Sequence, residues 1–419
     1  MTNLNDLSRE DHDAIERLKD CSDEMVEQTV HWSEMNTGST NTNGLKAFAP
    51  KLADALSVLD AEISLDAPDP FEHVNNHGEI EEIETGPIVR VKGRPDAPLQ
   101  IVMSGHYDTV FPPDSGFTSV TDLGNGRLNG PGLADMKGGL RLMIEAMHTF
   151  ELGPMRDTIG YQIVITPDEE IGNFASAKAL TEAASSGAMI GMTYEPCMET
   201  GAMSGGRKGS AVFDVVLKGR AAHAGRAHAE GRSAIAAAAR FVADMEALNG
   251  QYEGVTFNTG KIDGGNAVNI VPDLAVIRFG ARAPDAEAAQ WATQQVDRLI
   301  SEAAALNGIS AHGHGGFYRP PKPRNTAQQA LFDAVHGTGR ALGLDLEFID
   351  TGGVCEGNNI FAAGVPNVDT LGVLGGRIHS AEEFVDTSSF AVRGALSALL
   401  LNRLADGRID AKAIKAMMP

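Results

Sequence analysis

The sequence has few cysteines, few basic side chains and no long apolar run. Its three cysteines, Cys21, Cys197 and Cys355, stand far apart and outside any CxxC pair, which predicts reduced packing thiols in a cytoplasm rather than a disulfide framework or metal ligands. Lys and Arg number 34 against 56 Asp and Glu, so the formal net charge is -22. This balance argues against nucleic-acid and anionic-membrane partners, although a local arginine pair can still bind an anionic substrate.

Neither a membrane span nor a secretory signal is visible in the sequence. No stretch approaches the roughly 20 apolar residues that a spanning helix needs, and residues 1–20 are polar and acidic without the apolar core of a signal peptide. We therefore expect a cytoplasmic protein with no membrane and no nucleic-acid partner.

What the chain does contain is typical of a large α/β enzyme. Hydrophobic residues make up 42% of 419 positions, enough to build cores for two or three domains. Residues 11–35 and 43–60 have helical patterns. Short apolar runs at 87–91, 99–104, 161–166 and 188–194 then alternate with helices, among them the Met-rich stretch 136–147. Continuous apolar strands separated by amphipathic helices predict a mixed sheet covered by helices on both faces.

The pattern changes near residue 205. An alternating strand at 210–219, an alanine-rich helix at 232–247, strands at 256–264 and 274–283, and a long helix at 285–306 follow the order of a ferredoxin-like α+β unit. After 325 the earlier helix–strand alternation resumes. We therefore expect a larger α/β domain in two parts, 1–205 and 318–419, with a smaller α+β domain, 206–317, inserted between them.

Histidines and carboxylates concentrate in four segments that each follow a predicted strand, 104–112, 130–139, 166–173 and 193–196, and in a fifth near the end of the chain, 375–384. Sites in open α/β sheets form beyond the carboxyl ends of strands, so these segments are expected to meet at one edge. The candidate metal ligands are His106, Asp135, Glu170, Glu195 and His379.

Two imidazoles and three carboxylates suit two metal ions if one carboxylate bridges them. Nitrogen and oxygen ligands without thiolate favour zinc, with cobalt or manganese as possible replacements. Two acids remain: Asp108 lies two residues after His106 and is expected to orient that imidazole. Glu169 neighbours Glu170 and is expected to act as general base, because a partly desolvated carboxylate among other acids has a raised pKa.

In this order, the segments resemble the zinc-dependent peptidase superfamily of glutamate carboxypeptidase, aminoacylase and succinyl-diaminopimelate desuccinylase, over nearly the whole chain. The segment GLADMKGG at 132–139 is similar to the one that holds the family's bridging aspartate. The resemblance implies that Asp135 bridges the metals and precedes a cis peptide bond to Met136. The other ligands would divide into two pairs, His106 with Glu195 and Glu170 with His379.

The resemblance also implies the catalytic and substrate-binding roles. Glu169 would be the general base and Asp108 the acid that orients the histidine. The inserted domain would be a lid and dimerisation domain, in which His223 of GRAAHAG enters the partner subunit's active site to stabilise the oxyanion. Asn269 and Arg282 would bind a substrate carboxylate, a role that suits the two parallel hydrogen bonds an arginine can donate.

Position 195 holds Glu rather than Asp, which resembles the carboxypeptidase and desuccinylase branch. The sequence departs from the family at His228, where a proline is usual, and at Cys355 and Glu356, where Ser or Thr and Asp are usual. These departures put the side-chain specificity in doubt and leave the ligands in place. His312 and His314, like His228, are expected to be surface or lid residues.

We expect a dimeric, dizinc amidohydrolase that cleaves an N-acyl amino acid or a C-terminal, glutamate-like residue. The alternatives are a dipeptidase, an N-carbamoyl-amino-acid hydrolase or a desuccinylase with the same centre, and a non-catalytic binding protein, against which the retained ligands argue. Arg207, Lys208 and Arg319 either bind an anion or are solvated charges.

Overall fold

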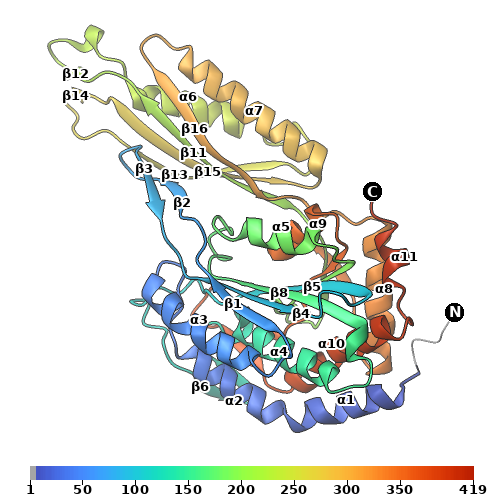
Figure 1. Cartoon of the computed structure of the whole chain (residues 1–419). Helices are drawn as coiled ribbons and strands as arrows, with labels where there is room; N and C mark the ends of the chain where they lie inside the picture. Colours follow the sequence, from blue (N-terminus) through green and yellow to red (C-terminus); the bar gives the residue numbers. More distant parts are fainter. Residues whose placement is uncertain (1–5) are drawn as a thin grey trace.

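The computed structural model describes residues 6–419, and its larger part is built on a six-stranded mixed sheet (Figure 1). In spatial order the strands are β1 (Glu62–Asp66), β4 (Ile88–Gly93), β8 (Ile159–Thr166), β5 (Leu99–His106), β9 (Ile190–Thr193) and β18 (Asn367–Val368). The strands β8, β5, β9 and β18 are parallel to one another. At one edge, β4 pairs antiparallel with β8, and β1 pairs antiparallel with β4.

Both faces of this sheet are buried, as the apolar runs predict. Ile101, Met103 and Ile163 belong to the larger hydrophobic cluster on one face, whereas Val102 and Val164, their neighbours in sequence, belong to a smaller cluster on the other. Successive strand residues point to opposite faces, so a strand covered on both sides needs apolar residues at nearly every position.

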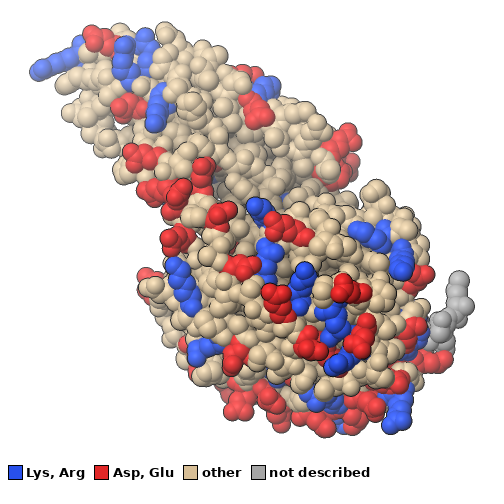
Figure 2. Space-filling model, viewed as in Figure 1, with Lys and Arg blue, Asp and Glu red and all other residues tan. Residues whose placement is uncertain are grey.

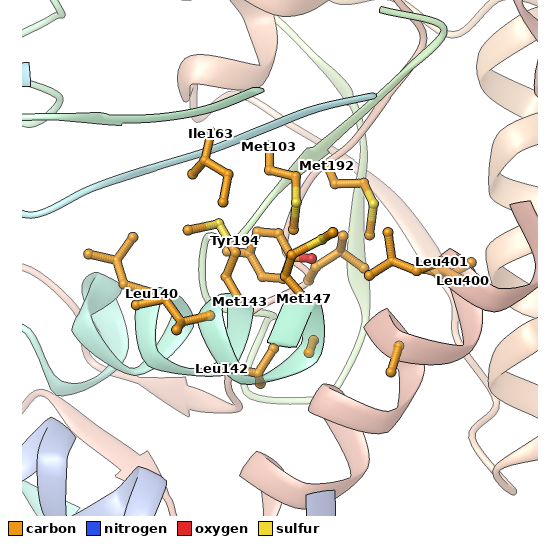
Figure 3. Packing of buried hydrophobic residues seen from close by; sticks show 14 of the residues in the cluster. Met103, Leu140, Leu142, Met143, Met147, Ile163, Met192, Tyr194, Leu400 and Leu401 are labelled. Atoms are coloured by element: carbon orange, nitrogen blue, oxygen red, sulfur yellow. The ribbon is translucent and has the colours of Figure 1, made fainter. Parts of the chain in front are cut away.

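Helices cover the two faces unequally. The larger cluster contains residues of α1 (Arg9–Asp20), α2 (Ser22–Ser33), α3 (Thr42–Leu56), α4 (Gly138–Glu151), α8 (Thr326–Ala341), α10 (Ser389–Ala405) and α11 (Ala411–Lys415). The smaller cluster contains residues of α5 (Ala177–Ser185) and α9 (Glu356–Ala362). Figure 3 shows the centre of the larger cluster, where Met143 and Met147 of α4 lie between Met103 and Met192 of the sheet and Leu400 of α10.

The stretch 11–35, predicted as one helix, forms two. The first begins after Ser8, whose hydroxyl accepts a hydrogen bond from the Asp11 backbone N–H at 3.1 Å while the Asp11 carboxylate accepts one from Ser8 N–H at 3.1 Å. It ends at Cys21, and α2 begins at the next residue. The break lets α1 pack against α10 while α2 packs against α4, which a straight helix of that length would not do.

The smaller part of the molecule contains a four-stranded antiparallel sheet with two helices. Its spatial order is β13 (Thr256–Gly264), β15 (Leu274–Ala283), β11 (Gly209–Lys218) and β16 (Ser310–Arg319), and α6 (Ala234–Glu246) and α7 (Ala286–Ala304) cover one face. The β-α-β-β-α-β order predicted from the sequence is thus confirmed. The paired strands β12 (Ala222–His223) and β14 (Ile270–Val271) lie at its far tip (Figure 1).

The remaining strands form three small sheets. These are the hairpin β2 (Phe71–Val74) and β3 (Ile80–Ile83), the parallel pair β10 (Met203–Arg207) and β17 (Phe348–Thr351), and the sheet β19 (Gly375–Gly376), β20 (Phe384–Asp386), β7 (Arg127–Asn129) and β6 (Thr121–Gly124). The β2–β3 hairpin rises from the larger part toward the four-stranded sheet (Figure 1). Within the described part of the chain, none of the helices has the length and apolarity to cross a membrane. All three cysteines are free.

Candidate metal centre

Three parallel strands bring candidate ligands to one edge of the six-stranded sheet. His106 is the last residue of β5, Glu169 and Glu170 follow the end of β8, and Glu195 follows the end of β9. His106 pairs in register with Thr166 of β8, so these strand ends are level. The chain therefore delivers these side chains together because the strands are parallel neighbours.

Asp135 reaches the same place by a different route from the one predicted. The strand before it, β7, belongs to the separate four-stranded sheet of β6, β7, β19 and β20, so it is not a strand of the main sheet. Asp135 instead lies in the turn Leu133–Lys137 that leads into α4. The expectation that four strands of one sheet carry the ligands is wrong for this segment. The Asp135–Met136 peptide bond is cis, as expected.

The Asp135 carboxylate lies between the two histidines. Its Oδ1 is 3.1 Å from Nε2 of His106, and its Oδ2 is 3.2 Å from Nε2 of His379. Nε2 of His379 also lies 3.1 Å from Glu170 Oε2, and Nε2 of His106 lies 3.7 Å from Glu195 Oε1. One carboxylate thus faces two imidazoles, each of which has a further carboxylate beside it.

Asp108 holds two parts of this cluster. Its carboxylate lies 3.3 Å from Nδ1 of His106, on the side of the ring away from Asp135. Its two oxygens accept hydrogen bonds from the backbone N–H groups of Glu169 at 3.0 Å and of Glu170 at 3.1 Å, and Oδ2 accepts another from the Ser39 hydroxyl at 2.7 Å. This fully buried carboxylate therefore fixes both the His106 imidazole and the Glu169–Glu170 turn.

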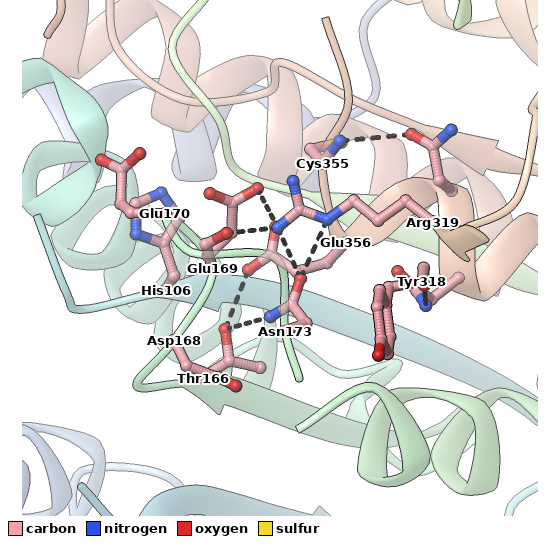
Figure 4. A network of polar contacts seen from close by, with 12 residues as sticks. His106, Thr166, Asp168, Glu169, Glu170, Asn173, Tyr318, Arg319, Cys355 and Glu356 are labelled. Carbon is pink, nitrogen blue, oxygen red and sulfur yellow. Dashed lines mark hydrogen bonds and ion pairs between the residues drawn. The ribbon is translucent and has the colours of Figure 1, made fainter. Parts of the chain in front are cut away.

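Glu169 is buried and paired with Arg319. Nη2 of Arg319 lies 2.8 Å from Glu169 Oε1 and also donates to the Glu169 carbonyl. Figure 4 shows the guanidinium extending between Glu169 and Asn173, whose Oδ1 accepts from Nη2 at 2.8 Å. Its contacts with Glu169 and Asn173 make Arg319 a buried, ion-paired residue, so it is not a solvated charge. Asn173 gave no signal in the sequence.

Glu383 is a second residue that the sequence did not reveal. Its carboxylate is buried and accepts hydrogen bonds from the backbone N–H groups of Gly132, Ala134 and Asp135 at 3.0, 2.9 and 3.1 Å. These bonds fasten the turn that carries the central carboxylate. The only available signal was its place four residues after His379, within the acidic pair Glu382–Glu383.

Two of the three positions that depart from the family, Cys355 and Glu356, lie beside Glu195, with ligand atoms within 4.8 Å of one another. Glu356 is fully buried and accepts a hydrogen bond from Thr166 Oγ1 at 3.3 Å (Figure 4). Burial, with the charge of Glu169, raises its pKa to about 7. Burial also raises the pKa of the Cys355 thiol well above its usual value, which keeps it neutral and a poor metal ligand.

The donor set fits divalent cations. Ligand atoms of His106, Asp135 and Glu170 lie within 4.8 Å of one another, as do those of His106, Glu169 and Glu195. Burial raises the pKa of Glu170 to about 8, with the charge of Asp135 adding to the rise, and it raises the pKa of Glu195 well above its usual value. Buried carboxylates thus outnumber the cations beside them, an excess of negative charge that bound metal ions would offset.

A cavity of 680 Å³ opens onto this cluster. Arg207, Arg282, Arg319 and Arg377 line it together with the carboxylates. Arg207 is ion-paired with Asp369, whereas Arg282 donates to the Ser210 hydroxyl and has no carboxylate partner among the described residues. Nε of Arg377 lies 3.9 Å from Glu199 Oε1. Arg282 is therefore the arginine of this wall that has no carboxylate beside it among the described residues and is free to bind an anionic ligand.

His223 and Asn269 lie elsewhere. They are exposed at the tip formed by β12 and β14, where the Ala224 N–H donates to the Asn269 carbonyl at 2.9 Å. Neither lines the cavity of its own chain. The structure thus places eight of the ten predicted residues in the wall of one cavity or in contact with that wall. It places His223 and Asn269 beside each other at the far end of the smaller part of the molecule.

A buried group of carboxylates and imidazoles, suited to metal ions and open to a cavity at the strand ends of an α/β sheet, defines a metal-dependent hydrolase. Residues 102–403 match Peptidase family M20/M25/M40, and the chain belongs to this family.

Two curated relatives and one solved structure illustrate the likeness. Carboxypeptidase G2 of Pseudomonas sp. strain RS-16 is 26% identical over 328 residues, covering 76% of this chain and 77% of its own. Succinyl-diaminopimelate desuccinylase of Nitrosococcus oceani is 28% identical over 328 residues, covering 74% and 85%. The M20 family metallo-carboxypeptidase Sso-CP2 of Sulfolobus solfataricus has the same fold, with a TM-score of 0.70 and 15% identity over 90% of this chain and 99% of that one.

Proposed function

We propose that the chain is a dizinc amidohydrolase of the carboxypeptidase type, which cleaves the amide bond of an N-acyl amino acid or of a C-terminal, glutamate-like residue. The observation that carries the proposal is the Asp135 carboxylate, whose two oxygens face Nε2 of His106 and Nε2 of His379 at 3.1 and 3.2 Å. This arrangement supports two metal sites that share Asp135, one completed by His106 and Glu195 and the other by Glu170 and His379.

Zinc ions held there, or cobalt or manganese in their place, would supply Lewis-acid chemistry, polarising a carbonyl and making water more acidic. Glu169 takes a proton from the attacking water and passes it to the leaving nitrogen, so that water and the amide become a carboxylate and an amine. Arg319 holds the Glu169 carboxylate at 2.8 Å, and Asp108 holds the backbone of the same turn. A charge-assisted contact of this kind fixes the base in one position before substrate arrives.

The substrate's free carboxylate would bind Arg282 in the cavity. His223 and Asn269 are exposed at the tip of the inserted domain, which supports a homodimer in which a second copy presents both residues to this cavity. There His223 would stabilise the oxyanion and Asn269 would help to bind the carboxylate. The proposal keeps the division into 1–205, 206–317 and 318–419, with the middle part as lid and dimerisation domain, and a cytoplasmic location.

The test combines metal analysis with one substitution. Purified protein should contain about two zinc ions per chain, and Glu169→Gln should lower kcat by about 100-fold to 10,000-fold while the zinc content stays unchanged. Glu302→Gln removes the charge of an exposed glutamate in α7 and serves as the control with normal turnover. A Glu169→Gln variant that keeps most of its activity would refute the assignment of the base.

A substrate panel tests the specificity. N-acyl amino acids that differ only in the released residue should be turned over best when that residue is acidic, and Arg282→Met should remove the preference. If the enzyme instead hydrolyses unblocked dipeptides, N-carbamoyl amino acids or N-succinyl-diaminopimelate efficiently, the proposed substrate is wrong and the proposed metal centre still stands.

A further inference from the structure

A second cavity adjoins the one at the metal centre. It has a volume of 640 Å³ and lies between the β2–β3 hairpin, the segment after Glu170, and strands β11 and β16 of the inserted sheet. Ile171 and Val212 line both cavities. Because the two spaces share these walls, one ligand could occupy both at once.

Strand β11 runs along both cavities. Ala211, Phe213 and Val215 pack into the core under α6 and α7, so the alternate residues point the other way. Of these, Ser210 lines the first cavity and lies beside Arg282, and Asp214 lines the second. Four strand residues span about 13 Å, a length that suits the two halves of a small amide substrate.

The wall of the second cavity is aromatic and apolar. The rings of Phe71 and Phe174 stack with centroids 5.3 Å apart, and the ring of Tyr318 meets Phe174 edge-on at 4.4 Å. Val212, Tyr318, Ile80 and Ile83 also line this cavity, and their exposed fractions are 41%, 37%, 50% and 36%. Large apolar side chains gathered in a concave, water-exposed wall mark a ligand site.

The hairpin that supplies much of this wall is fixed in place. Val74 packs against Val216 and Val276 of the inserted sheet, and its carbonyl accepts a hydrogen bond from Nη2 of Arg278 at 2.8 Å. Nζ of Lys261 lies 3.3 Å from Asn76 Oδ1 at the hairpin turn. The cavity is therefore formed before a ligand enters it, which reduces the ordering cost of binding.

The charges of the two cavities differ. Arg278 lines the second cavity, but its guanidinium already contacts Asp214 at 3.4 Å and Asp263 at 2.5 Å. Glu72 and Glu84 line the same cavity. Figure 2 shows carboxylates gathered where the β2–β3 hairpin lies. This wall offers no free guanidinium to an anion, in contrast to Arg282 in the first cavity.

We propose that the second cavity is the acyl-side subsite and that it takes an uncharged group with an aromatic ring, so that the substrate is an N-aroyl amino acid rather than an N-succinyl one. The proposal rests on the proposed function, because it assigns the half of the substrate that Arg282 does not hold. The amide lies at the metal cluster, the carboxylate at Arg282, and the ring passes Ile171 and Val212 to stack against Phe71, Phe174 and Tyr318.

The experiment compares kcat/KM for N-benzoyl, N-acetyl and N-succinyl derivatives of the same amino acid with the metal-loaded enzyme. We expect the wild type to prefer N-benzoyl over N-acetyl by about tenfold or more and to use N-succinyl least. Phe71→Ala should lower kcat/KM for the N-benzoyl substrate about threefold to tenfold, the range of one aromatic contact, and change the N-acetyl value less than twofold.

Two further variants separate a subsite from a loss of folding. Phe117 is also half-buried and meets Phe111 with ring centroids 5.0 Å apart, but it lines neither cavity, so Phe117→Ala should leave the substrate ratios unchanged. Ile80→Lys places a cation on an exposed position of the wall and should raise N-succinyl turnover relative to N-benzoyl by about threefold.

Each negative result has its own meaning. If the wild type turns over N-acetyl and N-benzoyl substrates equally and Phe71→Ala lowers both alike, the subsite is refuted and the hydrolase remains. If no N-acyl amino acid is cleaved by protein that holds metal, the proposed function fails and the subsite fails with it.

Discussion

Asp369 provides the sharpest test of how much a buried ion pair contributes to the free energy of unfolding. Its carboxylate is fully buried just after β18, and Oδ2 lies 2.7 Å from Nζ of Lys322 and 2.5 Å from Nε of Arg207. Lys322 is fully buried as well. One carboxylate is therefore paired with two buried cations, and the pKa of Asp369 is lowered because these cations outweigh the effect of burial.

Asp369→Asn removes this charge and leaves both cations unpaired in the interior. Removing one partner of a buried ion pair costs about 3–5 kcal/mol, a large share of the roughly 5–15 kcal/mol by which most proteins are stable. Asp350→Asn is the matched control: Asp350 lies 2.6 Å from Nε of Arg324, but its side chain is 63% exposed. An exposed pair contributes only about 0–1 kcal/mol.

The assay is thermal and urea unfolding of the metal-loaded variants, followed by circular dichroism. We expect Asp369→Asn to lower the midpoint temperature by about 5 °C or more and Asp350→Asn by less than about 3 °C. Arg207 lines the cavity, so Asp369→Asn should also raise KM. Equal stability of the two variants would refute the reasoning from burial.

Three further predictions concern acid, packing and metal. The pKa of Asp11 is lowered because hydrogen bonds from Arg408, Ser8 and Asn402 outweigh burial. Its stabilising contribution is therefore complete above the unfolded pKa near 3.8 and lost as the pH falls through the lower folded pKa, so Asp11→Asn should destabilise at pH 7 and much less at pH 2. Leu142→Ala, at a fully buried position of α4, should cost about 2–5 kcal/mol in urea unfolding, whereas the same change at Leu152, 62% exposed, should cost under about 0.5 kcal/mol. Removing metal with a chelator should lower the midpoint temperature reversibly, since metal at about 100 times its Kd adds about 2.7 kcal/mol; an unchanged midpoint would argue against ions at the buried carboxylates.

Local sequence patterns predicted much of the fold. The apolar runs predicted the strands β4, β5, β8 and β9, since a strand buried on both faces must be apolar throughout. The order of the main elements from 209 to 319, without the two-residue strands β12 and β14, followed from period-2 and period-3.6 patterns alone. The family, its fold and its hydrolase class were predicted from the motifs and are confirmed by the family match. The roles of individual residues, the zinc ions and the dimer stay predictions.

The sequence by itself determined which residue types follow the strands β5, β8 and β9, and its motifs predicted the side chains that the fold brings together at the centre. Only the tertiary structure decided what holds them. Glu383 accepts a hydrogen bond from the backbone N–H of Asp135, which lies 248 residues away in the sequence. Arg319 lies 150 residues from Glu169, which it contacts. The β2–β3 hairpin packs against a sheet that lies more than a hundred residues later in the chain. Periodicity reports only which face of an element is apolar, whereas such contacts depend on how distant elements pack, which no local pattern encodes.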